Sequence, residues 1–282
     1  MFLALWSTGY VAAKFGLAFA EPMTFLALRF CCVVAIMAVL FAILRPPLPS
    51  SRMDWVHLVI VGFLLQSMYF GMCYMAFKSN LAVGTLALIL SLQPIAVGLV
   101  APSWTGEKIG WQRWCGLVLG LLGAAIVITA RSEIEPPTVV SFVFAFLALF
   151  GITSGSLWEK RFGVAHHPVT SNLIGYAAGL VGVLPFMLAL ESMHVNWTWE
   201  FVASLVYLVI GSSLIAVGLL LAMIRAGDVS RVSALFFLVP PLAALVAWFV
   251  LDEVMPPLAW AGMVLAALGV FIATRTLKAG RV

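Results

Sequence analysis

Ten long apolar runs follow one another along this 282-residue chain, each separated from the next by proline, glycine or charged residues. A helix that crosses the hydrocarbon core of a bilayer needs about 20 mostly apolar residues. We therefore predict an all-α integral membrane protein with ten transmembrane helices. The predicted spans are 2–19, 23–44, 55–77, 81–102, 112–130, 139–159, 169–190, 201–224, 231–251 and 257–275.

The composition supports this interpretation. Hydrophobic residues make up 64% of the chain and charged residues only 9%, whereas soluble domains carry about 25% charged residues. A soluble globule of this size therefore lacks the charged surface that it needs. The net charge of +4 is scattered along the chain, so no clustered basic face for nucleic acid is expected.

The lysines and arginines predict the orientation of the helices, because cytoplasmic loops of membrane proteins are enriched in them. With the N-terminus inside, the outside connections hold only Lys78 and Arg131, while Lys14 and Arg29 fall within spans. We expect both termini in the cytoplasm and the protein in the cell inner membrane. The eleven basic residues on the inside are Arg45, Arg52, Lys108, Arg113, Lys160, Arg161, Arg225, Arg231, Arg275, Lys278 and Arg281.

The two halves of the sequence repeat each other at an offset of about 146 residues. The Pro22–Thr24 motif recurs at 168–170, and the spaced tryptophan and glycines of 114–123 recur at 260–269. We predict one five-helix unit over residues 1–131, a second over 138–276, and a cytoplasmic tail over 277–282. Since five is odd, the second copy is expected to be inverted, which is typical of secondary transporters with a central cavity.

The order of these motifs resembles the EamA family of the drug/metabolite transporter superfamily, and the resemblance covers nearly the whole chain. It rests on Leu5-Trp6-Ser7 with Ala13-Lys14, Pro22 to Phe30, Ser91-Leu92-Gln93-Pro94, Glu107, and Trp114 with Gly116, Gly120 and Gly123. It also rests on Pro240-Pro241, Asp252-Glu253, and Trp260 with Gly262 and Gly269. The resemblance implies ten helices around a central cavity and transport of amino acids or related metabolites, often outward.

Two cations lie within predicted spans, where charge is costly. Lys14 and Arg29 fall at similar depth below the outer surface, about 7.5 and 9 Å by helical rise. One interpretation is a cationic vestibule that attracts a substrate carboxylate. The alternatives are that both side chains extend to the interface, or that one pairs with Glu21.

Polar and aromatic residues near midspan are the other candidates for the cavity wall. A lipid-facing amide would stay unsatisfied, so these side chains should point inward, with simple hydrogen bonds between helices as the alternative. The candidates are Trp6, Ser7, Tyr10, Gln66, Tyr69, Gln93, Asn172, Tyr176 and Ser213.

Prolines interrupt the fourth and ninth spans at matching places, at Pro94 and at Pro240-Pro241. Each proline removes a helical hydrogen bond, so we interpret them as gating kinks, with a packing kink as the alternative. The spaced glycines of the fifth and tenth spans favour close helix packing, with a homodimer face as a further interpretation.

These observations predict a secondary transporter of small metabolites, an exporter of compounds such as amino acids, working by alternating access of the two halves. The competing hypothesis is a membrane enzyme or flippase-like accessory that acts on lipid-linked substrates. No catalytic motif was found, and no cofactor or metal site is expected. The expected partners are a small-molecule substrate and the lipid bilayer.

Overall fold

The structure is a computed structural model, and it describes residues 1–81, 83–131, 138–163, 166–242, 245 and 256–274. All of its named elements are helical. They are α1 (Phe2–Gly16), α2 (Pro22–Leu44), α3 (Arg52–Gly62), η1 (Phe63–Phe70), α4 (Gly71–Lys78), α5 (Val83–Leu90), α6 (Gln93–Trp104), α7 (Trp111–Arg131), α8 (Val139–Phe162), α9 (Pro168–Leu190), α10 (Trp199–Tyr207), η2 (Leu208–Val217), α11 (Gly218–Ala226), α12 (Val229–Ala234), η3 (Leu235–Leu238) and α14 (Pro257–Thr274).

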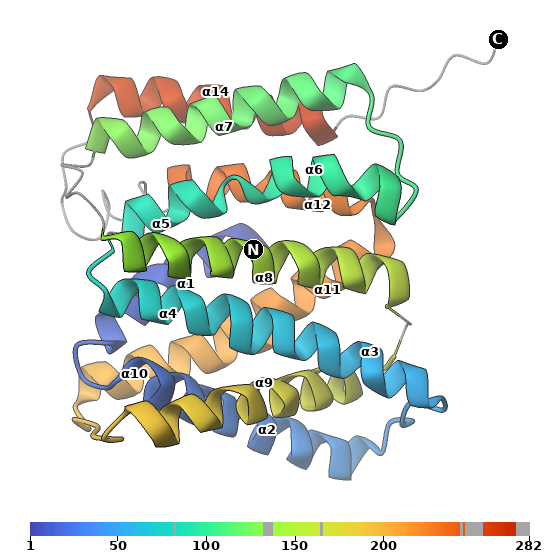
Figure 1. The fold of residues 1–282 in the computed structure, drawn as a ribbon, viewed down its shortest axis with the longest axis vertical. Coiled ribbons are helices and arrows are strands. Elements are labelled where there is room, and N and C mark those ends of the chain that lie inside the picture. Colours follow the sequence, from blue (N-terminus) through green and yellow to red (C-terminus); the bar gives the residue numbers. More distant parts are fainter. Residues whose placement is uncertain (82, 132–137, 164–165, 243–244, 246–255, 275–282) are drawn as a thin grey trace.

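Several of these elements join into longer rods that run side by side (Figure 1). Within the described residues, eight helical segments of at least 18 residues are apolar enough to cross a membrane. They are Pro22–Leu44, Arg52–Lys78, Thr85–Trp104, Trp111–Ala130, Val139–Phe162, Pro168–Leu190, Trp199–Ala226 and Pro257–Thr274.

The first predicted span is shorter in the structure, where helix α1 has 15 residues. The described helical residues at the ninth predicted span are Val229–Leu242. Most of the rest of the predicted ninth span lies outside the described residues, as do Asp252, Glu253 and the tail 277–282. The multi-span membrane class is confirmed, and the number ten stays a prediction.

Local sequence accounts for where the helices begin. Proline occupies the start of α2 and α9, where its missing N–H leaves no helical hydrogen bond unmade. The side chains of Ser51 and Thr198 accept hydrogen bonds from backbone N–H groups at the starts of α3 and α10, as N-cap residues do. The repeated proline motifs of the two halves are therefore helix starts.

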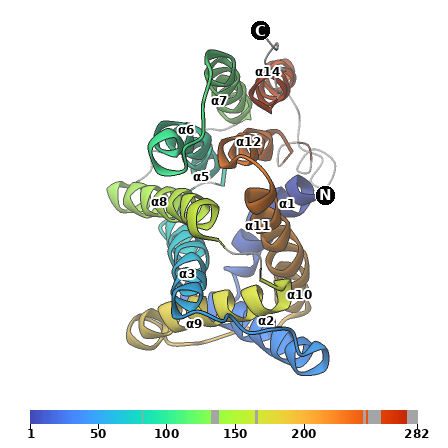
Figure 2. The same ribbon diagram turned by 90° about the vertical axis from the view of Figure 1, so that its right-hand side faces the viewer.

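Figure 2 looks roughly along the helix axes. Helices α3 and α8 form one side, and α1, α10 and α11 form the opposite side. Helices α2 and α9 lie together along the bottom edge of this view, and α7 and α14 pair with each other along its top edge. We call the two ends of the rods the Ala20 end, with residues 17–21 and 191–198, and the Gly227 end, with residues 45–51 and 227–228.

The small residues of α7 and α14 pack against each other within the chain. A Cβ atom added at Gly116 would lie 2.4 Å from the backbone nitrogen of Ala273, and one added at Gly123 would lie 2.2 Å from that of Ala266. The pairing is antiparallel, because the earlier glycine of α7 meets the later residue of α14. The face that suggested a homodimer is thus used in this internal contact.

This contact generates a stability prediction. Gly123→Ala adds a methyl group that has no room between the two backbones, and we expect it to destabilise the protein by about 1–3 kcal/mol. Thermal unfolding in detergent measures the change. Gly218→Ala is the matched control, because its Cβ atom would meet nothing within 4 Å. Equal stability of the two variants would contradict the described packing.

Candidate functional site

The guanidinium of Arg29 lies at the centre of the bundle. The side chain projects from α2 and is fully buried, with 0% exposure. Nε donates to Ser213 Oγ at 2.7 Å, Nη2 to Ser212 Oγ at 3.1 Å, and Nη1 to Tyr74 Oη at 3.3 Å. The guanidinium carbon lies 4.4 Å from the ring centroid of Phe70.

All three of these hydrogen-bond acceptors are neutral hydroxyl groups. Among the described residues, no carboxylate lies within 4 Å of the Arg29 guanidinium. Arginine does not lose its proton in proteins, and a buried charge without a counter-ion is costly. In the part of the chain that the structure describes, the site therefore has a positive charge with no counter-ion.

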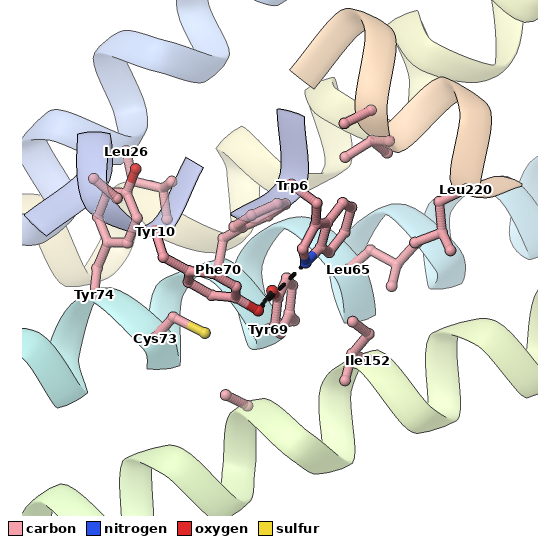
Figure 3. Close-up of a cluster of buried hydrophobic side chains, with 14 of the residues drawn as sticks. Trp6, Tyr10, Leu26, Leu65, Tyr69, Phe70, Cys73, Tyr74, Ile152 and Leu220 are labelled. Carbon is pink, nitrogen blue, oxygen red and sulfur yellow. Dashed lines mark hydrogen bonds between the residues drawn. The ribbon is translucent and has the colours of Figure 1, made fainter. Parts of the chain in front are cut away.

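Aromatic side chains form the wall beside this charge (Figure 3). Trp6 Nε1 donates to Tyr10 Oη at 3.3 Å, and Tyr10 Oη lies 2.6 Å from Tyr69 Oη. The rings of Trp6 and Tyr69 are stacked, with centroids 6.0 Å apart. The hydroxyls and the indole N–H thus satisfy one another and leave the ring faces for apolar contacts.

A small cavity joins the aromatic wall to the charge. Its volume is about 10 Å³, which is about the space of one water molecule. Arg29 and the aromatic residues share it, so the structure shows this site closed. The polar or aromatic residues lining it are Trp6, Tyr10, Arg29, Tyr69, Phe70, Tyr74, Phe77 and Ser212.

Two π-helical segments supply many of the polar groups of the site. Segment η1 carries Gln66 and Tyr69, and segment η2 carries Ser212 and Ser213. The segments lie at equivalent places in the two halves, and each is followed by a glycine. Because π-helical turns often occur at functional sites, their positions agree with a central site. Sequence reasoning missed them, although the matched glycines Gly71 and Gly218 were visible.

A second polar cavity lies next to the first, toward the Gly227 end. Its volume is about 20 Å³. It brings together three predicted residues, Gln66, Asn172 and Tyr176, and two that were not predicted, Glu159 and Arg225. Tyr176 Oη donates to the Ser213 carbonyl at 2.9 Å, so this residue joins the second cavity to the Arg29 site.

The structure separates the two intramembrane cations of the sequence. Lys14 is exposed and lines a cavity of about 610 Å³ at the Ala20 end, together with Lys78 and His194. Arg29 lies in the closed cavity instead. Phe77 lines both cavities, so its ring lies between the open vestibule and the central charge.

Two other predicted residues lie outside both central cavities in the described structure. Ser7 is fully buried on α1, and its Oγ has no hydrogen-bond partner. Gln93 begins α6 and donates from Nε2 to Ser233 Oγ at 3.0 Å. Pro94 follows it, directly after the break between α5 and α6. Gln93 thus joins α6 to α12. Neither Ser7 nor Gln93 contacts Arg29.

The prolines of the ninth predicted span are also buried, and they lie next to an irregular helical turn. Pro240 and Pro241 follow the 3₁₀-helical turn η3, which itself follows α12. Both halves therefore interrupt the α-helix just before the prolines that the sequence identified, by the turn at Ser91 and Leu92 in one half and by η3 in the other.

Charged residues tie the two halves together at each end of the bundle. At the Ala20 end, the Glu191 carboxylate accepts hydrogen bonds from the backbone N–H groups of Met23 and Thr24, at 2.8 and 2.7 Å. In return Glu21 accepts from the N–H and hydroxyl of Ser192, and these bonds lower the pKa of the Glu21 carboxyl below its usual value.

The Gly227 end has an equivalent arrangement. Glu107 accepts from the backbone N–H groups of Val229 and Ser230, at the start of α12, at 2.6 and 3.3 Å. Arg113 donates to Asp228 Oδ2 at 3.1 Å. A carboxylate from one half thus binds a helix N-terminus of the other half at both ends, where the helix dipole favours negative charge.

Apolar helical segments long enough to cross a bilayer define this chain as an integral membrane protein. The model of the EamA-like transporter family matches residues 1–129 and 135–275. The chain therefore belongs to the EamA-like transporter family.

Individual relatives carry transporter names. The "Probable amino-acid metabolite efflux pump" of Salmonella typhimurium is 24% identical over 96% of this chain and 91% of its own. The "Probable terminal-alkyne amino-acid exporter" of Streptantibioticus cattleyicolor is 29% identical over 70% of this chain and 65% of its own. The "S-adenosylmethionine uptake transporter" of Rickettsia bellii is 24% identical over 73% of this chain and 67% of its own.

A solved crystal structure also shares the fold. Its TM-score is 0.79 at 21% sequence identity, and the match covers 97% of this chain and 94% of that one. This likeness shows the fold alone.

Proposed function

We propose that this transporter carries small metabolites with an α-carboxylate, amino acids and their analogues, and that Arg29 holds the carboxylate. The observation that carries the proposal is the buried guanidinium whose hydrogen-bond acceptors are Ser212, Ser213 and Tyr74. An arriving carboxylate supplies the missing negative charge and replaces neutral acceptors with a charge-assisted, bidentate pair.

The aromatic residues beside Arg29 suit the remainder of such a substrate. Trp6, Tyr10 and Tyr69 line the same cavity as Arg29, and Phe70 already lies over the guanidinium. Rings accept many shapes because contact with their faces is not directional. The site would thus require a carboxylate on the substrate but accept many different substrate side chains.

The names of the relatives support this substrate class and an outward direction. Two of the three are named for amino-acid efflux or export. The third is named for uptake of S-adenosylmethionine, a compound that itself carries an α-amino acid group, so it supports the substrate class and not the direction. Export from the cytoplasm is the direction that we propose for this chain.

We propose that ten helices cross the membrane as two inverted halves, residues 1–131 and 138–276, with a cytoplasmic tail at 277–282. Support comes from the matching π-helical segments, and from the packing of α2 against α9 and of α7 against α14, which are repeat mates. The family match in two segments with nearly the same bounds agrees with this division.

Alternating access would move these halves relative to each other. The closed central cavity has room for about one water molecule, so binding a metabolite requires the helices around it to separate. Pro94, Pro240 and Pro241 lie where helical geometry is already interrupted. Bending at these places would open one end of the rods. At the other end, the contacts between a carboxylate of one half and a helix N-terminus of the other half would stay formed.

The distribution of basic residues supports an inner-membrane protein with both termini in the cytoplasm. In this orientation the Ala20 end, with the large vestibule, faces the outside. The Gly227 end, with Glu107 and Arg113, faces the cytoplasm.

The substrate proposal predicts a selective loss in Arg29→Gln. In proteoliposome exchange across a panel of amino acids, we expect kcat/KM to fall about 10- to 100-fold, because a hydrogen bond to a charged group contributes about 1.5–3 kcal/mol. Arg29→Lys should keep part of the activity, since it keeps the charge.

Lys14→Gln is the matched control, because Lys14 is a cation of a neighbouring span that lies exposed in the vestibule. We expect a change of less than about fivefold, since exposed charge pairs contribute about 0–1 kcal/mol. Wild-type exchange by a folded Arg29→Gln protein would refute the assignment.

The orientation proposal predicts the labelling of single cysteines in intact cells. In a background without the native cysteines, a membrane-impermeant maleimide should label His194→Cys directly. It should label Ser50→Cys only after permeabilisation, because that residue lies at the Gly227 end. The reverse labelling, or labelling of both from outside, would overturn the orientation.

A further inference from the structure

The second polar cavity contains an ion pair that the carboxylate site does not use. Arg225, near the end of α11, donates from Nε to Glu159 Oε1, near the end of α8. The Glu159 side chain is 1% exposed and that of Arg225 is 20% exposed. Burying a carboxylate is costly unless it is paired, and the burial of this pair distinguishes it from the exposed charges that are ordinary near the ends of membrane-spanning helices.

The same cavity contains polar atoms that lack partners. Gln66 Oε1 and Ser171 Oγ are both buried without a hydrogen bond, and their residues are 3% and 7% exposed. Both atoms line a polar space together with Asn172. Buried oxygens without donors are rare in folded proteins, and here they are free to accept hydrogen bonds from a ligand.

Only one layer of side chains separates this cavity from the central charge. Tyr176 lines the cavity and donates to the Ser213 carbonyl, and the hydroxyl of Ser213 accepts from Arg29 Nε. Gln66 lies on η1, the same π-helical segment that carries Tyr69. A ligand that leaves this cavity past Tyr176 would therefore reach Arg29 next.

We propose that this cavity marks an entry station for zwitterionic α-amino acids: when the helices around it separate, the amino acid binds here from the Gly227 end before it reaches Arg29. The carboxylate pairs with Arg225, and the ammonium group pairs with Glu159 and donates to Gln66 Oε1 and Ser171 Oγ. This inference rests on the proposed function and adds to it the recognition of the amino group.

Charge balance decides the class of ligand. A zwitterion can part Glu159 from Arg225 and still leave each of them paired, one with the ammonium and one with the carboxylate. An N-acylated amino acid would pair with Arg225 but leave Glu159 buried and unpaired, which is strongly unfavourable. Arg29 reads the carboxylate alone, so selection for the free amino group arises at this station.

The test measures KM separately from each side of the membrane, in right-side-out and inside-out vesicles, for amino acids and their N-acetyl forms. The informative variant is Glu159→Gln/Arg225→Gln, because it removes both charges and leaves neither unpaired. We expect its KM for amino acids to rise at least tenfold at the Gly227 face and to change little at the Ala20 face. Its preference for amino acids over N-acetyl forms should disappear.

Lys108→Gln is the control, since it removes an exposed cation at the same end, and it should transport like the parent. An unchanged KM in the double variant, or an equal rise at both faces, would overturn the station. Arg29→Gln in the same vesicles separates the two proposals. If Arg29→Gln loses transport while the double variant is normal, only the entry station is wrong; if Arg29→Gln transports normally, the carboxylate site is wrong.

Discussion

A guanidinium held among neutral hydroxyl groups, inside a bundle whose surface is apolar, organises this structure. Arg29 carries a charge that it cannot lose, and the membrane offers no water to solvate it. The protein compensates with Ser212, Ser213 and Tyr74 and with the ring of Phe70. These groups lower the cost of the charge without neutralising it, and this is the basis of the proposal that the site binds a carboxylate.

The rest of the fold encloses this charge and leaves a small cavity beside it. The π-helical segments η1 and η2 supply Tyr69 from one half and the two serines from the other, while α7 and α14 pack tightly through small residues away from the site. Carboxylates cap helix N-termini of the opposite half at both ends. These contacts join the two halves at both ends of the rods, which are the places that would have to open in the proposed alternating access.

Much of the architecture could be predicted from the sequence. The thickness of the hydrocarbon core sets the length of each span, and the apolar runs of the sequence have that length. The helix starts at Pro22 and Pro168 also follow from local chemistry. The candidate residues were partly predictable for the same reason: a polar side chain at midspan, such as Gln66, must face the interior, whereas Arg29, nearer the outer surface, could also have extended to the interface. The remaining features depend on contacts between distant residues. No local code distinguishes a π-helical turn from an α-helical one, so η1 and η2 were missed. Glu159 and Arg225 lie near span ends, where charge is ordinary, and only the fold shows that they form a buried pair.

The most direct test of the central claim is the thermal unfolding of the purified protein with a panel of amino acids and with the amide of each one. A ligand that binds only the folded state raises the unfolding temperature, and the amide differs from the acid mainly by lacking the carboxylate charge. The account predicts that at least one amino acid raises the unfolding temperature, that its amide does not, and that Arg29→Gln loses the response. An amide that stabilises the protein as much as its parent acid would contradict it.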